Sequence, residues 1–435
     1  MTQHNKNINK PPLGVSLVFY LLGNATLLPW NFLITAESYW QYKVRDVTLG
    51  DEWNSPNATL TSLQISFTPT LIIIANVCST AFFIITSTLI WKISERVRIG
   101  WSLVVALLCM LLTTVLTLIN SDSWQTLFFV ITMVIVAFLN ASIAVTLGSC
   151  CGLAGIFPDS CMTSWISGQA LAGVLSSLAR LVSLGVGGEA MDPAISGLIY
   201  FLLADAFLSV TIAGYMALRK TSYYVKVKEE VEKAADTQNT QNTHQQGSNR
   251  NRRDLRAYLA VLSKIWPMGT TQAITLAITI SVFPAVVVYI TSSLPDETRW
   301  TQVFYQPTIT FLLFNVGDFM GREMSRLVKW PGPRGWLLHV LGVGRVVFVL
   351  LLLLCYGHNK TFPTLFYHDA YYIIINSLFS FTNGYIITLT YIYYTEFLDP
   401  CEYEMGGGIM VALSGIGVII GSLVSPGLVK LWGPV

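Results

Sequence analysis

Eleven apolar runs, each long enough to cross a membrane as a helix, constrain this chain more than any other feature of its sequence. A span needs about 20 predominantly apolar residues, and backbone groups at that depth must be satisfied within the protein. The sequence therefore predicts an all-α membrane protein with eleven transmembrane helices, approximately at residues 13–35, 65–91, 99–120, 125–157, 162–186, 195–219, 267–293, 302–328, 336–357, 369–395 and 405–431.

Composition agrees with a protein whose main partner is the lipid bilayer. Apolar residues make up 53% of the 435 positions and charged residues 11%, against about 25% charged residues in soluble proteins. The net charge of +2 is too small to suggest a nucleic-acid partner. The seven cysteines lie almost wholly within or beside apolar runs, which is neither a disulfide framework nor a metal signature. Phosphate-binding and zinc motifs are missing from the sequence, so we expect no enzyme activity, cofactor or metal.

A polar stretch at about residues 220–257 separates the sixth apolar run from the seventh. It has almost no apolar content, which is typical of a disordered linker. The predicted organisation is a six-helix bundle at 1–219, a cytoplasmic disordered linker at 220–257 and a five-helix bundle at 258–435.

Lysine and arginine residues predict the orientation, because they accumulate in cytoplasmic loops. With the N-terminus in the cytoplasm, 18 of the 26 lie in inner segments and five in outer ones. Eleven spans then place the C-terminus outside. The sequons at Asn57 and Asn359 fall in predicted outer loops and are the candidate glycosylation sites. The N-terminal tail has no acidic dileucine signal, which favours the plasma membrane; an endosomal or lysosomal membrane stays open.

The eighth apolar run carries a polar stripe formed by Asn315, Asp318 and Arg322. Spacings of three and four residues place these side chains on one face of a helix. A charge at bilayer depth costs about 2.5–3.5 kcal/mol on insertion scales, so such residues usually face a partner or a water-filled pathway. The stripe predicts a site for a polar solute, although a self-contained intrahelical ion pair is the alternative.

Three other positions have both a functional and a packing interpretation. Trp30 could stack on an aromatic base or could be an interfacial tryptophan. The small residues of 167–173 favour close helix packing, and Gln169 among them is a neutral hydrogen-bonding group at membrane depth. Phe283 stands before a proline at an expected kink, where packing is the default. Two further bases at membrane depth have no identifiable partner in the sequence: Arg180 and Arg345.

Several ordered motifs make the chain similar to the equilibrative nucleoside transporter family. The motifs run from the first span to the last and include LLPWNFLITAESYW, ERVRIGWSLV, GLAGIFP with SGQALAG, SVFPAV, FLLFNVGDFMGREM, RVVFVLLLLLC, FTNGYIITL and GGGIM. The resemblance implies a major-facilitator-like bundle with a central site. It also implies alternating access that carries nucleosides or nucleobases down their gradient.

The resemblance also implies roles for individual residues. Leu27 and Trp30 match the family's first-helix pocket, and Asn31 matches its neighbouring polar contact. Asp318 and Arg322 match the pair that the family uses against the ribose. The chemistry fits, because ribose hydroxyls can donate to a carboxylate and accept from a guanidinium.

Four more positions bear on gating and selectivity through the same resemblance. Arg98 and Glu404 match positions that hold the cytoplasmic side closed. Leu147 stands where better-known members carry a glutamine that contacts the base, so broad purine and pyrimidine selectivity is expected. Gln169 stands where a cation-transporting branch carries a glutamate, which argues against cation transport.

The sequence thus predicts a facilitative carrier of nucleosides such as adenosine and uridine. Within transporters, the alternatives are a nucleobase or monoamine carrier, or a proton-coupled nucleoside carrier that titrates Asp318. A receptor or channel is the alternative from another class, but eleven spans and gate-like charges do not favour it.

Overall fold

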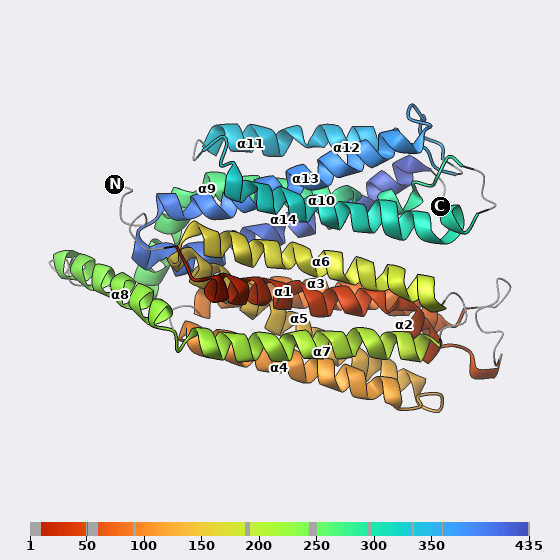
Figure 1. Ribbon diagram of the computed structural model, residues 1–435, viewed down its shortest axis with the longest axis horizontal. Helices are drawn as coiled ribbons and strands as arrows, with labels where there is room; N and C mark the ends of the chain where they lie inside the picture. The colour runs from red at the N-terminus through yellow and green to blue at the C-terminus, as the bar shows by residue number, and fades with distance from the viewer. Residues whose placement is uncertain are drawn as a thin grey trace.

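The computed structural model describes residues 10–48, 50, 60–89, 93–187, 192–242, 250–294, 298–332, 335–358 and 360–433. They form an elongated bundle whose long helices run along one common axis (Figure 1). The helices of the first part, here called the N-half, are α1 Leu13–Thr35, α2 Glu37–Lys43, α3 Ser62–Leu89, α4 Glu95–Leu118, α5 Gln125–Ile156, α6 Asp159–Gly187 and α7 Pro193–Leu218.

Helix α8, Ser222–Asn242, follows the N-half and projects from one end of the bundle (Figure 1). The remaining elements, here called the C-half, are α9 Arg250–Val282, η4 Val287–Tyr289, η5 Trp300–Phe304, η6 Gln306–Leu312, α10 Leu313–Leu327, α11 Gly335–Gly344, α12 Val346–Leu353, α13 Asp369–Tyr393, η7 Tyr394–Phe397, η8 Pro400–Glu402 and α14 Tyr403–Trp432.

The bundle has two distinct ends. The start of α1 and helix α8 lie at one end, here called the linker end, and α2 lies at the other, here called the α2 end (Figure 1). The two halves meet mainly where α6 packs along α10 and where α14 packs along α3 and α5. These interfaces bring segments far apart in sequence to the middle of the bundle.

Within the described residues, nine helical segments are long and apolar enough to cross a membrane. They match nine of the eleven predicted spans. Helix α6 and the segment Trp300–Leu327 are outside this group. Serine and glycine dilute the apolar content of α6, and charged residues interrupt that of α10. The chain is an all-α, multi-pass membrane protein.

The prediction of a disordered linker at 220–257 is wrong for Ser222–Asn242, because these residues form helix α8. Tyr224 and Val227 are buried, and the ring of Tyr224 packs against Phe157 with centroids 5.5 Å apart. The Tyr224 hydroxyl donates to Glu95 Oε1 over 3.2 Å, and Lys228 pairs with the same carboxylate. An apolar stripe at helical spacing therefore docks this polar segment onto the linker end.

Close backbone contact fixes α1 against α6. A Cβ atom on Gly23 would lie 1.8 Å from the carbonyl oxygen of Trp165, and one on Gly168 would lie 2.1 Å from that of Tyr20. Such distances admit only glycine, which lets two helices approach with their backbones nearly in contact. The packing interpretation of the small residues at 167–173 is confirmed.

Candidate functional site

Helix α10 presents a buried ion pair at the interface between the two halves. Arg322 Nε donates to Asp318 Oδ2 over 2.8 Å, and Arg322 Nη2 lies 2.8 Å from the same oxygen as part of the ion pair. The exposed fractions are 5% for Asp318 and 7% for Arg322. A charge-assisted hydrogen bond of this kind is roughly twice as strong as one between neutral groups. The predicted i, i+4 pair is present.

Asn383 of α13 also forms a hydrogen bond with the Asp318 carboxylate. Its Nδ2 donates to Asp318 Oδ1 over 2.7 Å. The contact depends on the close packing of α10 and α13, because a Cβ on Gly384 would lie 1.9 Å from the Asp318 carbonyl oxygen. Asn383 lies in the motif FTNGYIITL, where a neutral asparagine in an apolar run gives no sign of a site residue.

Arg345 also belongs to this cluster, and the structure supplies the partners that the sequence did not reveal. Its Nη1 donates to Asn383 Oδ1 over 3.1 Å and to Thr279 Oγ1 over 2.9 Å. Its Nη2 donates to the Phe379 carbonyl over 2.9 Å, and its guanidinium lies 4.6 Å from the centre of the Phe379 ring. Arg345 is thus a tether among helices of the C-half.

Two hydrogen bonds join the polar stripe to the N-half. Arg322 Nη1 donates to the Ile166 carbonyl on α6 over 2.7 Å, and Asn315 Nδ2 donates to Ser177 Oγ over 2.8 Å. A Cβ on Gly173 would lie 2.4 Å from Asn315 Oδ1, so the helices touch closely here. The site therefore has contacts that must change if the halves move relative to each other.

The other predicted pocket residues lie on α1, α5 and α6. Leu27 and Trp30 of α1 and Leu147 of α5 are half-buried at the edge of the main apolar core. Asn31 and Gln169 are half-buried on α1 and α6. Helix α6 packs against both α1 and α10, and a shared pocket of these positions with the ion pair stays a prediction.

Phe283 packs within the C-half. Its ring stacks on Phe314 with centroids 3.9 Å apart and meets Phe311 edge-on at 5.7 Å. These ring contacts are those of a packing residue, and the predicted role of Phe283 in substrate binding stays a prediction. Arg180 Nη1 on α6 donates to the Thr35 carbonyl over 3.5 Å.

At the linker end, Arg98 and Glu404 form an ion pair between α4 and α14. The Arg98 side chain is 3% exposed and that of Glu404 29%. Glycine again permits the approach, since a Cβ on Gly152 would lie 2.9 Å from the Glu404 Cα. The resemblance placed these two residues together, and the structure does so as well.

Further contacts between the halves cluster at the same end and were not predicted. Lys329 pairs with Asp159 over 2.5 Å. Tyr20 bonds to Glu323, and Arg326 donates to Ser164 Oγ over 3.1 Å. In the sequence, charged residues at helix ends look like ordinary loop residues. The sequence therefore contained no indication that these residues pair with each other.

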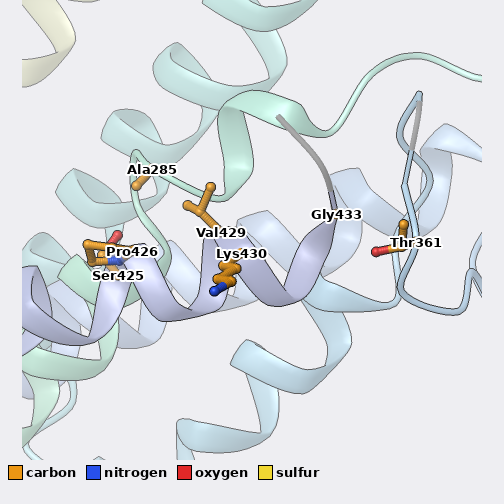
Figure 2. Close-up of a pocket in the computed structure, with 7 residues that line it drawn as sticks. All are labelled: Ala285, Thr361, Ser425, Pro426, Val429, Lys430 and Gly433. Atoms are coloured by element: carbon orange, nitrogen blue, oxygen red, sulfur yellow. The ribbon is translucent and has the colours of Figure 1, made fainter.

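A separate cavity of about 630 Å³ lies at the α2 end of the C-half. Figure 2 shows Ser425, Pro426, Val429 and Lys430 along α14, with Ala285 and Thr361 on neighbouring segments. None of the predicted site residues lines it. The candidate glycosylation sites Asn57 and Asn359 lie outside the described residues.

Solved structures with the same arrangement of helices show the fold of this chain. The chain superposes on the proton:xylose symporter XylE with a TM-score of 0.65 and 10% identity, over 98% of this chain and 90% of that one. It superposes on the transporter FucP in its outward conformation with a TM-score of 0.57 and 11% identity, covering 95% and 90%. The chain therefore has the major facilitator superfamily fold.

Sequence comparisons show the family. The family described as nucleoside transporter matches residues 131–429. Equilibrative nucleoside transporter 2 of Rattus norvegicus is 32% identical, covering 94% of this chain and 96% of its own. Equilibrative nucleoside transporter 1 of Homo sapiens is 30% identical, covering 95% and 96%. The chain belongs to the nucleoside transporter family.

Proposed function

We propose that this protein carries nucleosides such as adenosine and uridine across a membrane, down their gradient, by alternating access. The observation that carries the proposal is the buried Asp318–Arg322 pair, which lies between the halves and bonds to both of them. A solute that carries several hydroxyl groups fits such a site. Ribose hydroxyls can donate hydrogen bonds to a carboxylate and accept them from a guanidinium, and they add no charge to the site.

The proposed spans are eleven, in a six-plus-five arrangement. Trp300–Leu327 forms the eighth span through η5, η6 and α10, and α11 with α12 forms the ninth. Helix α6 forms the fifth, since it runs the full length of the bundle between α1 and α10 (Figure 1). Its polar content is tolerated because neighbouring helices cover it.

The linker end is the proposed cytoplasmic end, in accord with the lysine and arginine distribution. The N-terminus of the chain then lies inside and its C-terminus outside. The plasma membrane is the proposed location, with Asn57 as the glycosylated residue. In this orientation the described hydrogen bonds and ion pairs between the halves run from Asn315–Ser177 to the cytoplasmic end. This is the pattern of a carrier closed on the inside.

Uptake of labelled uridine and adenosine into oocytes expressing the protein tests the proposal. We expect saturable uptake that stops when the two sides equilibrate. Competition by nucleosides, free nucleobases and 2′- and 3′-deoxy analogues tests the recognition of the ribose. Nucleobases that compete as well as nucleosides would contradict it.

Leu147→Gln should tighten recognition of at least one class of base. An aliphatic wall discriminates by only about 1–3 kcal/mol, whereas a hydrogen-bonding site rejects analogues that lack the matching group far more strongly. We therefore expect KM for one class, purine or pyrimidine, to fall by about tenfold. The KM values of adenosine, inosine, uridine and cytidine measure this. Leu147→Met, which adds no donor, is the control and should leave all four within about twofold.

A further inference from the structure

A second cavity, here called the α4 groove, lies in the N-half and has a volume of about 350 Å³. Helices α3 and α4 each pack against α5, and the groove is lined by side chains of all three. Its lining includes Phe82 and Thr86 of α3, Arg98 and Trp101 of α4, and Phe138 of α5. None of the predicted substrate-binding residues lines it, so the α4 groove is separate from the proposed nucleoside site.

The apolar mouth of the α4 groove faces lipid. Trp101 is 67% exposed and Phe138 is 61% exposed, and α4 lies at the edge of the bundle (Figure 1). Exposed apolar side chains on a membrane-spanning helix contact the acyl chains of the bilayer. The groove is therefore open to the membrane.

Arg98 brings a positive charge to the wall of this apolar groove. Its side chain is 3% exposed, and its Nη2 pairs with Glu404. Its Nε and Nη1 are buried and have no hydrogen-bond partner among the described residues. A guanidinium has five N–H donors and no acceptor, and an unpaired donor of a buried charged group costs free energy. The pair with Glu404 thus satisfies only part of the bonding capacity of Arg98.

Neighbouring groups do not supply the missing acceptor. Glu95 lies one helical turn before Arg98, but its carboxylate accepts from Tyr224 and pairs with Lys228. Thr86, on the α3 wall of the groove, is 2% exposed, and its hydroxyl also has no partner in the part of the chain that the structure describes. Unpaired donors on two walls and an apolar mouth fit a molecule with an anionic head and an apolar chain.

The depth of Arg98 indicates which molecule this is. Arg98 lies in the first turn of α4, Glu95–Leu118, and the end of a span lies near the lipid head groups. Trp101 follows one turn later, and tryptophan is enriched at this level of the membrane. The linker end is the proposed cytoplasmic end, and the cytoplasmic leaflet carries acidic phospholipids such as phosphatidylserine. A lipid phosphate can thus reach Arg98 without crossing the hydrocarbon core.

We propose that the α4 groove binds one acidic phospholipid of the cytoplasmic leaflet. The phosphate accepts hydrogen bonds from the free nitrogens of Arg98 and from the Thr86 hydroxyl, and an acyl chain lies against Trp101 and Phe138. Arginine–phosphate hydrogen bonds are charge-assisted and therefore strong. The choice of leaflet rests on the proposed orientation of the chain, whereas binding itself does not depend on nucleoside transport.

Titration of the detergent-purified protein with phosphatidylserine that carries a fluorescent acyl chain tests the proposal. We expect saturable binding that is about fivefold tighter than that of the matching phosphatidylcholine, which has no net charge. Equal affinity for the two lipids would overturn the proposal. Oleate that binds as tightly as phosphatidylserine would show a fatty-acid site and overturn the assignment to a phospholipid.

Trp101→Glu should weaken the binding of phosphatidylserine. The new carboxylate lies three residues from Arg98 on the same helix, where it can pair with the free nitrogens in place of the phosphate. We expect Kd to rise about tenfold. Trp336→Glu is the matched control, because Trp336 is 69% exposed in the first turn of α11 and does not line the groove. Its Kd should stay within about twofold, and equal losses in both variants would overturn the proposal.

A milder pair of variants decides the matter if an added carboxylate prevents folding. Thr86→Val removes the hydroxyl from the groove, and we expect Kd for phosphatidylserine to rise about fivefold. Thr132 is also 2% exposed with an unpaired hydroxyl among the described residues, but it lies outside the groove on α5. Thr132→Val should therefore leave Kd unchanged. Equal Kd values for the two variants would overturn the proposal.

Discussion

Asp318→Asn should reduce nucleoside uptake by about two orders of magnitude or more. The substitution keeps the shape of the side chain but leaves Arg322 and Arg345 as two buried cations without a counter-charge. Removing one partner of a buried ion pair typically costs about 3–5 kcal/mol. The carboxylate that would accept from ribose hydroxyls is lost as well. Initial uridine uptake, normalised to the protein at the cell surface, measures the effect.

Asp205→Asn is the matched control, because Asp205 is a second aspartate buried in the bundle. Its Oδ2 accepts from Thr114 Oγ1 over 2.6 Å, within the N-half, and it is 6% exposed. We expect uptake by this variant to stay within about twofold of wild type, since an amide can keep the single bond. Near wild-type uptake by Asp318→Asn at normal surface level would show that the Asp318–Arg322 pair is purely structural.

Breaking the Arg98–Glu404 pair should produce the second large effect. A contact made in only one state stabilises that state by its own free energy, so Arg98→Ala should destabilise the inside-closed state. We expect the exchange rate of uridine to fall by about tenfold, while equilibrium accumulation stays the same. Uridine efflux and exchange from preloaded cells measure this.

The charge swap Arg98→Glu with Glu404→Arg tests direct pairing. We expect it to recover part of the exchange rate. Recovery should be incomplete, because Glu95 lies one helical turn from position 98 and would repel a carboxylate there. A swap no better than the Arg98→Glu single variant would argue against direct pairing as the gate.

The polar stripe of α10 was predictable because the residues that form it lie close together in the sequence. Asp318 and Arg322 are four residues apart on one helix, and charged residues within an apolar span usually mark a functional site. Helix positions were predictable for the same reason, and the predicted first span, 13–35, coincides with α1.

The remainder of the cluster was not predictable because its contacts are distant in sequence and uncharged. Asn383 lies 65 residues from Asp318, and a neutral asparagine in an apolar run gives no pattern. Arg345 was recognisable as a buried base, but its acceptors are carbonyls, hydroxyls and an amide of α9 and α13. Only tertiary packing identifies such partners.

Helix α8 was missed for a different reason. The polar average composition of this segment masked a short amphipathic pattern within it. The segment is polar overall, yet Tyr224 and Val227 recur at helical spacing and are buried against the linker end. An amphipathic period within a polar stretch predicts a docked surface helix. That signal was present in the sequence and was outweighed by composition.

Counterflow in proteoliposomes tests the central claim most directly. Vesicles containing the purified protein are loaded with unlabelled uridine and diluted into trace labelled uridine or adenosine, with and without a pH gradient. We expect transient accumulation of both labels, with the same amplitude whether or not the gradient is present. Absence of counterflow, or concentrative uptake driven by the pH gradient alone, would contradict a facilitative nucleoside carrier.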